Sequence, residues 1–149
     1  MQLRFGELDD TPARRQELRR QFDELRSRTP RLTQMVYEAA GFVLDQFGSA
    51  VCVTSVYRPD NPRSVHAWWR GVDIGRNSTG LTRAQMGDLA LYLNQLWVYA
   101  TGGNLWACVY GELDKYRRHW DHCHLQCHPD THLRPRPLSL ARLPCVPAV

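Results

Sequence analysis

Histidine dominates the chemistry available to this chain. Of its six histidines, five fall within fourteen positions: His119, His122, His124, His128 and His132. The sixth, His66, stands seven residues before Asp73. Histidine is the commonest protein ligand for metals, and a carboxylate often accompanies it at catalytic zinc. The pattern predicts a metal site with three protein ligands and an open position for water.

Two stretches of the chain carry these candidate ligands. Residues 64–75 contain Gly71 and no good helix cap, so we expect strand or turn there. Residues 119–127 predict a strand, in which side chains alternate between the two faces. His122 and His124 would then point the same way. If His124 binds the metal, His122 stands beside the open coordination position.

The first stretch resembles the signature of the zinc D-Ala-D-Ala peptidase superfamily. Members include phage L-alanyl-D-glutamate endolysins, vancomycin-resistance D,D-dipeptidases, murein endopeptidases, lysostaphin and the Hedgehog signalling domain. The family pattern S-x-H-x-x-G-x-A-x-D is matched by SVHAWWRGVD at residues 64–73 in its serine, histidine and aspartate. Trp69 stands where the family has glycine, and Gly71 stands where it has alanine.

Two further segments extend the resemblance, which covers about residues 50–126. TSVYR at residues 54–58 is similar to the family's T-S-x-Y-R segment, and the distal His-x-His block follows at residues 122–124. The resemblance implies zinc held by His66, Asp73 and His124, where it polarises a scissile carbonyl and activates a water. Arg58 and Ser64 are then expected on the substrate side, with the Arg58 guanidinium binding a carboxylate or the developing oxyanion.

The general base is open between two family patterns that this chain carries together. Endolysins and dipeptidases place an acid three residues before the last ligand, which here is Asp121. Carboxypeptidases and murein endopeptidases place histidines five and two residues before it, which here are His119 and His122. We favour Asp121 as base and His122 for oxyanion stabilisation, with His119 as a secondary candidate. Alternation of faces along a strand argues against Asp121 facing the same side as His124.

The order of expected elements predicts an α+β fold in one domain. A small antiparallel sheet holds the zinc site and packs against helices, with an N-terminal helical pair. The chain divides into a helical part (1–49), a zinc peptidase core (50–127) and a Pro-rich tail (128–149). The expected helices are 12–27, 31–47 and 83–100, and the expected strands are 50–57, 105–110 and 119–127. We expect the tail to be extended or partly disordered.

The cysteines offer a competing metal site. Cys123, Cys127, His128 and His132 form a C-x3-C-H-x3-H run, which could hold a second, structural zinc. The two pairs abut, with no intervening strand or helix to wrap the ion, so burial in the core is the more usual fate of these thiols. Cys52 and Cys108 fall in expected strands and are assigned to the core.

Charge and hydropathy exclude several classes of protein. The net charge is +4, but the first 31 residues mix eight arginines with six acids, which is typical of a solvated surface rather than a nucleic-acid interface. No apolar run approaches the ~18 residues of a transmembrane helix. The N-terminus shows no apolar signal-peptide core. We expect a cytoplasmic monomer that reaches the cell wall at lysis.

The function that these features favour is zinc-dependent hydrolysis of peptidoglycan stem peptides, as an endolysin or a D,D-carboxypeptidase. The alternative is a non-catalytic, zinc-containing binding domain of the same fold, as the Hedgehog relative illustrates. A third hypothesis is a structural zinc module built on the cysteine and histidine run.

Overall fold

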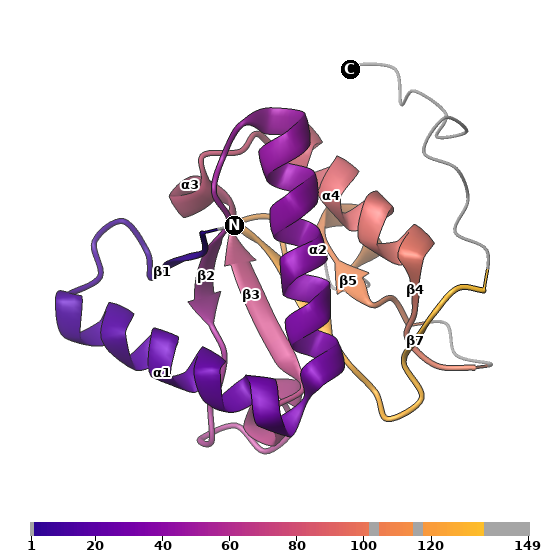
Figure 1. Ribbon diagram of the computed structural model, residues 1–149, viewed down its shortest axis with the longest axis horizontal. Coiled ribbons are helices and arrows are strands. Elements are labelled where there is room, and N and C mark those ends of the chain that lie inside the picture. The colour runs from indigo at the N-terminus through magenta and orange to yellow at the C-terminus, as the bar shows by residue number, and fades with distance from the viewer. Residues whose placement is uncertain (1, 102–104, 115–117, 136–149) are drawn as a thin grey trace.

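The computed structural model describes residues 2–101, 105–114 and 118–135, and this part of the chain forms an α+β fold (Figure 1). Its helices are α1 (Pro12–Arg28), α2 (Pro30–Phe47), α3 (Arg76–Thr79) and α4 (Arg83–Leu96). Its strands are β1 (Arg4–Phe5), β2 (Cys52–Ser55), β3 (Gly71–Gly75), β4 (Trp97–Val98), β5 (Cys108–Val109), β6 (His122–Gln126) and β7 (His132–Leu133). Two 3-10 turns, η1 (Val65–Trp68) and η2 (Gly111–Leu113), complete the described elements.

The main sheet has the strand order β1-β2-β3-β6-β5. Its neighbours are antiparallel except at one edge, where β1 runs parallel to β2. The pairing of β3 with β6 spans five residue pairs and forms the centre of the sheet. The expected antiparallel sheet is therefore confirmed, with one parallel pair added at its edge.

Local signals set the N-terminal helical pair. The Thr11 hydroxyl accepts from the Arg14 amide and Pro12 occupies the first turn, so α1 begins where a cap and a proline predict it. Pro30 starts α2 directly after α1, and Gly48 ends α2 in the left-handed conformation that glycine favours. The broad apolar face of α2 is fully buried at Met35, Val36 and Ala39.

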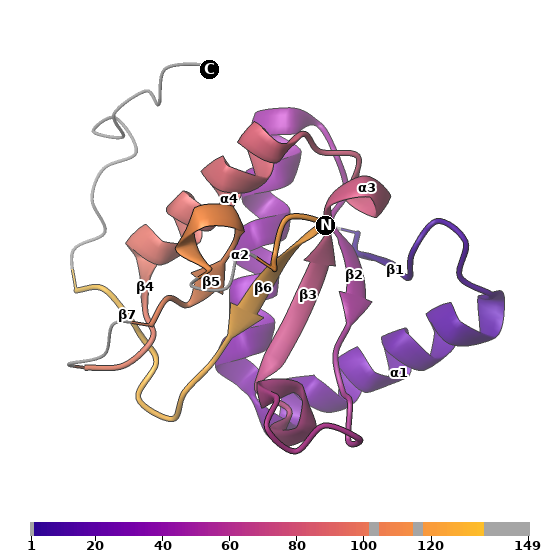
Figure 2. The same ribbon diagram turned by 180° about the vertical axis from the view of Figure 1, so that it is seen from behind.

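The core lies between one face of the sheet and the helices α1, α2 and α4. In Figure 1 α2 crosses in front of the strands, and Figure 2, from the other side, presents β2, β3 and β6 in front of α2. Val72, Ile74 and Leu125 are fully buried in the core cluster with the α2 face. Because side chains alternate along a strand, Asp73 and His124 point to the opposite face of the sheet.

Several expected boundaries are wrong. The helix expected over 83–100 ends at Leu96, because Trp97 and Val98 pair with His132 and Leu133 in a two-stranded sheet. The expected strands shorten to β2, β5 and β6, and the tail contributes β7. The short elements β1, α3, η1 and η2 were not expected, since two to four residues carry too little periodicity to predict. Residues 136–149 of the expected tail lie outside the described residues.

Trp69 has an unusual backbone conformation, with φ of 57° as the residue that closes η1. Left-handed geometry is costly for a bulky side chain and free of strain for glycine. In the segment that resembles the D-Ala-D-Ala peptidase pattern, this is the position at which the pattern has glycine. Here the indole stacks on Tyr57 with ring centroids 4.3 Å apart, and the Arg28 guanidinium lies 4.9 Å from the ring. These contacts offset the strain.

We expect Trp69→Gly to be more stable than Trp69→Ala by about 1 kcal/mol, measured by urea unfolding, because only glycine avoids the left-handed penalty. Both variants lose the stacking on Tyr57, so that loss cancels in the comparison. Trp68 provides the control, since its φ is negative and the order of glycine and alanine should reverse there. Equal stability of the two Trp69 variants would contradict strain at this position.

Candidate metal centre

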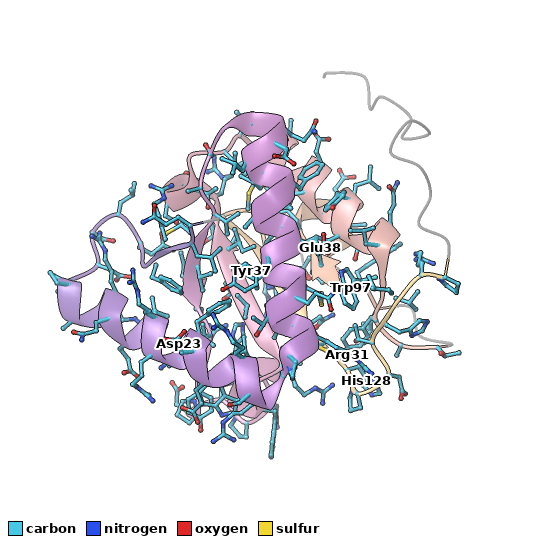
Figure 3. All side chains as sticks on the ribbon, in the orientation of Figure 1. Asp23, Arg31, Tyr37, Glu38, Trp97 and His128 are labelled. Atoms are coloured by element: carbon cyan, nitrogen blue, oxygen red, sulfur yellow. The ribbon has the colours of Figure 1, made fainter. Side chains whose placement is uncertain are left out.

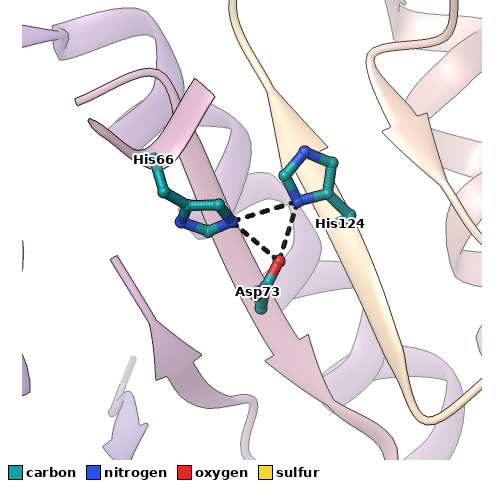
Figure 4. Close-up of side chains that lie close together, drawn as sticks. All are labelled: His66, Asp73 and His124. Atoms are coloured by element: carbon teal, nitrogen blue, oxygen red, sulfur yellow. Dashed lines mark hydrogen bonds and ion pairs between the residues drawn. The ribbon is translucent and has the colours of Figure 1, made fainter. Parts of the chain in front are cut away.

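Three elements bring one group of side chains together on the sheet face opposite α2. Asp73 on β3 stands directly across from His124 on β6 in the strand register. His66 comes from η1, whose first turn is capped by the Ser64 hydroxyl accepting from the His66 amide. Figure 4 shows the three side chains converging from these separate segments.

The facing atoms of the group lie within hydrogen-bond distance of one another. The distance from Asp73 Oδ1 is 2.8 Å to His124 Nδ1 and 3.2 Å to His66 Nε2. The two ring nitrogens are 3.3 Å apart. His66 is 1%, Asp73 4% and His124 9% exposed. Across the described residues, this is the one group of histidine, cysteine and acidic side chains that could hold a metal ion.

The hydrogen-bond directions and the spacing of these atoms are compatible with a bound cation. His66 Nδ1 lies 2.7 Å from the Val56 carbonyl oxygen, which can only accept, so Nδ1 donates. His66 Nε2 faces Asp73 Oδ1 at 3.2 Å, so either a proton or a metal ion can lie between these two atoms. Ligand atoms around a tetrahedral zinc lie about 3.3 Å apart, given bonds near 2.0 Å. The observed spacing therefore fits a bound metal ion.

Electrostatics keep both kinds of ligand in their metal-binding forms. Burial alone would raise the pKa of Asp73, but its contacts with His124 and His66 outweigh burial and hold the pKa well below its ordinary value. Burial lowers the pKa of His124, and the hydrogen bond to Asp73 only partly opposes this. At neutral pH Asp73 is thus a carboxylate and His124 a neutral imidazole, as metal ligation requires.

His122 borders the group on the same sheet face, as the expected alternation predicts. Its Nε2 lies 3.7 Å from Asp73 Oδ1, while its Nδ1 is 2.6 Å from Asp121 Oδ1. A carboxylate only accepts, so Nδ1 donates to Asp121 and Nε2 faces the candidate metal ligands. Asp121 itself has a side chain 75% exposed. The structure therefore pairs Asp121 with His122 rather than with the ligand group.

A second histidine–aspartate pair lies alongside. The His119 ring stacks on His124 with centroids 5.2 Å apart and meets His122 edge-on at 4.8 Å. Its Nδ1 is 2.8 Å from Asp114 Oδ2, and Asp114 is buried. Asp114 is a site residue that sequence reasoning missed. An acid five residues before a histidine was the only available signal, and it is a weak one.

The two residues expected on the substrate side occupy different positions. The Arg58 side chain is 49% exposed, and its Nη2 lies 3.3 Å from Asp73 Oδ2, so it borders the metal group from solvent. Ser64 serves as the cap of η1. Beneath the ligands, Gly71 leaves space for their rings, because a Cβ there would lie 3.0 Å from His66 Cδ2 and 3.1 Å from His124 Cε1.

The competing cysteine and histidine run does not converge. Cys123 is fully buried, and its thiol lies 3.5 Å from the Met86 carbonyl oxygen. His128 Nδ1 contacts the Asp130 carboxylate, and His132 Nδ1 is hydrogen-bonded to the Asp130 carbonyl oxygen. Burial raises the pKa of Cys127, whose thiol faces the His128 carbonyl. These thiols belong to the interior rather than to a second metal group.

No family model, curated protein or solved structure matches this chain. Among the described residues, none of the helices combines the length and the apolar character needed to traverse a bilayer.

We expect the purified chain to retain one zinc ion after dialysis, and Asp73→Ala or His124→Ala to retain almost none, measured by elemental analysis. The reason is that each variant removes one of three converging ligands. Asp121→Ala and Cys127→Ser are the controls and should keep full zinc occupancy. Loss of zinc in Cys127→Ser would instead support a site in the cysteine run.

Metal-free protein should lose stability as the pH falls below 6.5, the ordinary pKa of histidine. The lowered pKa of His124 means that the unfolded chain takes up this proton before the native state does. Its share of the free energy of unfolding therefore falls by up to about 1.4 kcal/mol per pH unit. Asp73 adds to this loss of stability only when the pH nears its ordinary pKa of 3.8, because its lowered pKa stabilises the native state at all higher pH values.

Urea unfolding of the metal-free chain at about pH 7.5 and about pH 5.5 measures this effect. His124→Gln should show a smaller drop between the two pH values than the unmodified chain. An equal drop in both proteins would contradict the assignment.

Proposed function

We propose that this protein is a zinc-dependent peptidase that hydrolyses bonds in peptidoglycan stem peptides, as a member of the D-Ala-D-Ala peptidase superfamily. The observation that carries the proposal is the convergence of His66, Asp73 and His124 beside two further histidines. The motif resemblance suggests the substrate class, and the set of ligand atoms suggests that the metal is zinc. Two imidazoles and one carboxylate are a ligand set typical of catalytic zinc. When bound, zinc supplies Lewis-acid catalysis and an activated water.

We assign proton transfer to His122. Its Nε2 faces the ligand group, and its Nδ1 donates to Asp121 at 2.6 Å, so the ring is held with one nitrogen free to accept and return a proton. Asp121 then acts as a positioning residue that fixes the tautomer and orientation of His122. This assignment modifies the expectation that Asp121 is itself the base, because its exposed side chain points at His122.

His119 and Arg58 complete the proposed site. The Asp114 carboxylate accepts from His119 Nδ1 and orients the ring, so Nε2 can take up a proton and, in the imidazolium form, donate toward developing negative charge. The Arg58 guanidinium stands at the solvent side of Asp73 and can form paired hydrogen bonds with a substrate carboxylate. Stem peptides carry such carboxylates, which is why this arrangement suits them.

The burial of the ligands favours one alternative, a binding domain in which zinc is structural. His66 and Asp73 are almost fully covered, and structural zinc sites are closed rather than open. In that case the chain would bind a partner without cleaving it. The two functions differ in whether peptide termini are produced.

The decisive experiment is digestion of purified sacculi, with released peptides identified by mass spectrometry. We expect new termini from the unmodified protein and none from His124→Ala. His122→Ala should keep its zinc and lose about 100-fold to 10,000-fold in rate, the usual contribution of a general acid or base. Asp121→Asn should lose less, because it leaves the proton-transferring ring in place.

A zinc-loaded protein that cleaves neither Gram-negative nor Gram-positive sacculi would overturn the peptidase proposal. Retained binding to those sacculi would then favour the binding domain. If His122→Ala cleaves at the normal rate while Asp121→Asn does not, proton transfer belongs to Asp121.

A further inference from the structure

We infer that a cavity at the junction of α1 and α2 binds an anionic group of the polymer on which the protein acts. The cavity has a volume of about 460 Å³ and is separate from the metal ligands. Its lining includes Arg28, Arg31, Trp68, Arg70, Cys127 and His128. Figure 3 labels Arg31 and His128, which approach each other near the N-terminal end of α2. The identity of the polymer rests on the proposed function, whereas the anion site rests on the cavity itself.

The arginines of the cavity are held in place by backbone carbonyls. Arg31 Nη1 donates to the carbonyl oxygens of Pro129 and Thr131, each at 2.8 Å. Arg70 Nε donates to the Cys127 carbonyl oxygen at 2.7 Å. Both guanidinium groups are therefore fixed along one edge, and their remaining N–H groups are available to a ligand. A pre-organised fork loses little entropy when it binds an anion.

Within the described residues no carboxylate pairs with Arg31 or Arg70, while Arg28 pairs with Glu24 at 2.7 Å. The nearby carboxylate of Asp130 contacts His128 rather than either arginine. Gathering like charges in one cavity is unfavourable, and an anion that bridges them would remove the repulsion. Arginine binds carboxylates and phosphates through paired hydrogen bonds.

Trp68 adds an aromatic surface to the same cavity. The residue is 64% exposed, although its indole N–H is already satisfied by the Pro62 carbonyl oxygen at 3.0 Å. The open part of the side chain is thus the apolar ring, which suits the non-polar face of a sugar or a peptide segment next to the anion. Trp68 lies two residues from His66, so one short segment serves both the cavity and the metal group.

Two sources in a cell wall present this chemistry, the carboxylates of stem peptides and the phosphates of wall polymers. Soluble poly-γ-D-glutamate and poly(glycerol phosphate) represent them separately, and neither contains the bond to be cleaved. We would measure binding of the zinc-loaded protein to each probe at about 0.15 M salt, where weak surface electrostatics are largely screened. Peptidase activity does not enter this measurement, so its absence would leave the anion site testable.

We expect Arg31→Gln/Arg70→Gln to weaken binding of one probe at least about tenfold, because two charge-assisted contacts are lost. Arg14→Gln/Arg19→Gln, on α1 and outside the cavity, removes the same net charge and should weaken binding less than about threefold. The probe that responds identifies the source as carboxylate or phosphate.

Arg31 and Arg70 also donate to backbone carbonyls, so replacing them could disturb the fold. A second variant therefore tests the site while both arginines stay in place. Pro129→Glu places a carboxylate at the cavity rim, where it should compete with the ligand and cost at least about tenfold in affinity. Equal weakening by both double variants would mean attraction to net charge alone and would overturn the proposal. Unchanged binding by Pro129→Glu, or no binding of either probe by the unmodified protein, would also overturn it.

Discussion

The pairing of β3 with β6 is the constraint on which the rest of this molecule depends. It sets Asp73 opposite His124 and Gly75 opposite His122, so one strand register delivers a carboxylate and two imidazoles to the same face. A shift of β6 by one residue would turn His122 and His124 into the core and expose Cys123. Because the apolar face of the sheet is buried against α2, that shift is strongly unfavourable, so the hydrophobic core fixes the geometry of the candidate metal centre.

A buried carboxylate explains the arrangement around it. Asp73 is nearly inaccessible, and an isolated charge there would be strongly unfavourable. Histidine nitrogens on one side and Arg58 on the other compensate that charge. The same compensation occurs at Asp114, whose buried carboxylate accepts a hydrogen bond from His119. The candidate chemistry is thus a set of aspartate–histidine contacts in graded exposure, from closed ligands to the solvent-facing pair of His122 and Asp121.

Much of the helical architecture could be predicted because its signals are local. The Thr11 cap with Pro12 and the Thr82–Gln85 capping box each act within a few residues and begin α1 and α4, and Pro30 separates α1 from α2. Pairing between distant segments leaves no such trace. The edge strand β1 and the β4–β7 pair depend on partners more than 30 residues away, so no local pattern predicts them.

The sequence by itself determined the ligand candidates His66, Asp73 and His124 through the motif resemblance, and strand alternation predicted that His122 and His124 share one face. Only the tertiary structure decided how their neighbours are used. Asp121 precedes β6 and its exposed carboxylate contacts His122, while the buried Asp114 carboxylate contacts His119, five residues later in the chain. Such roles depend on direction and burial in space, which chain order does not encode.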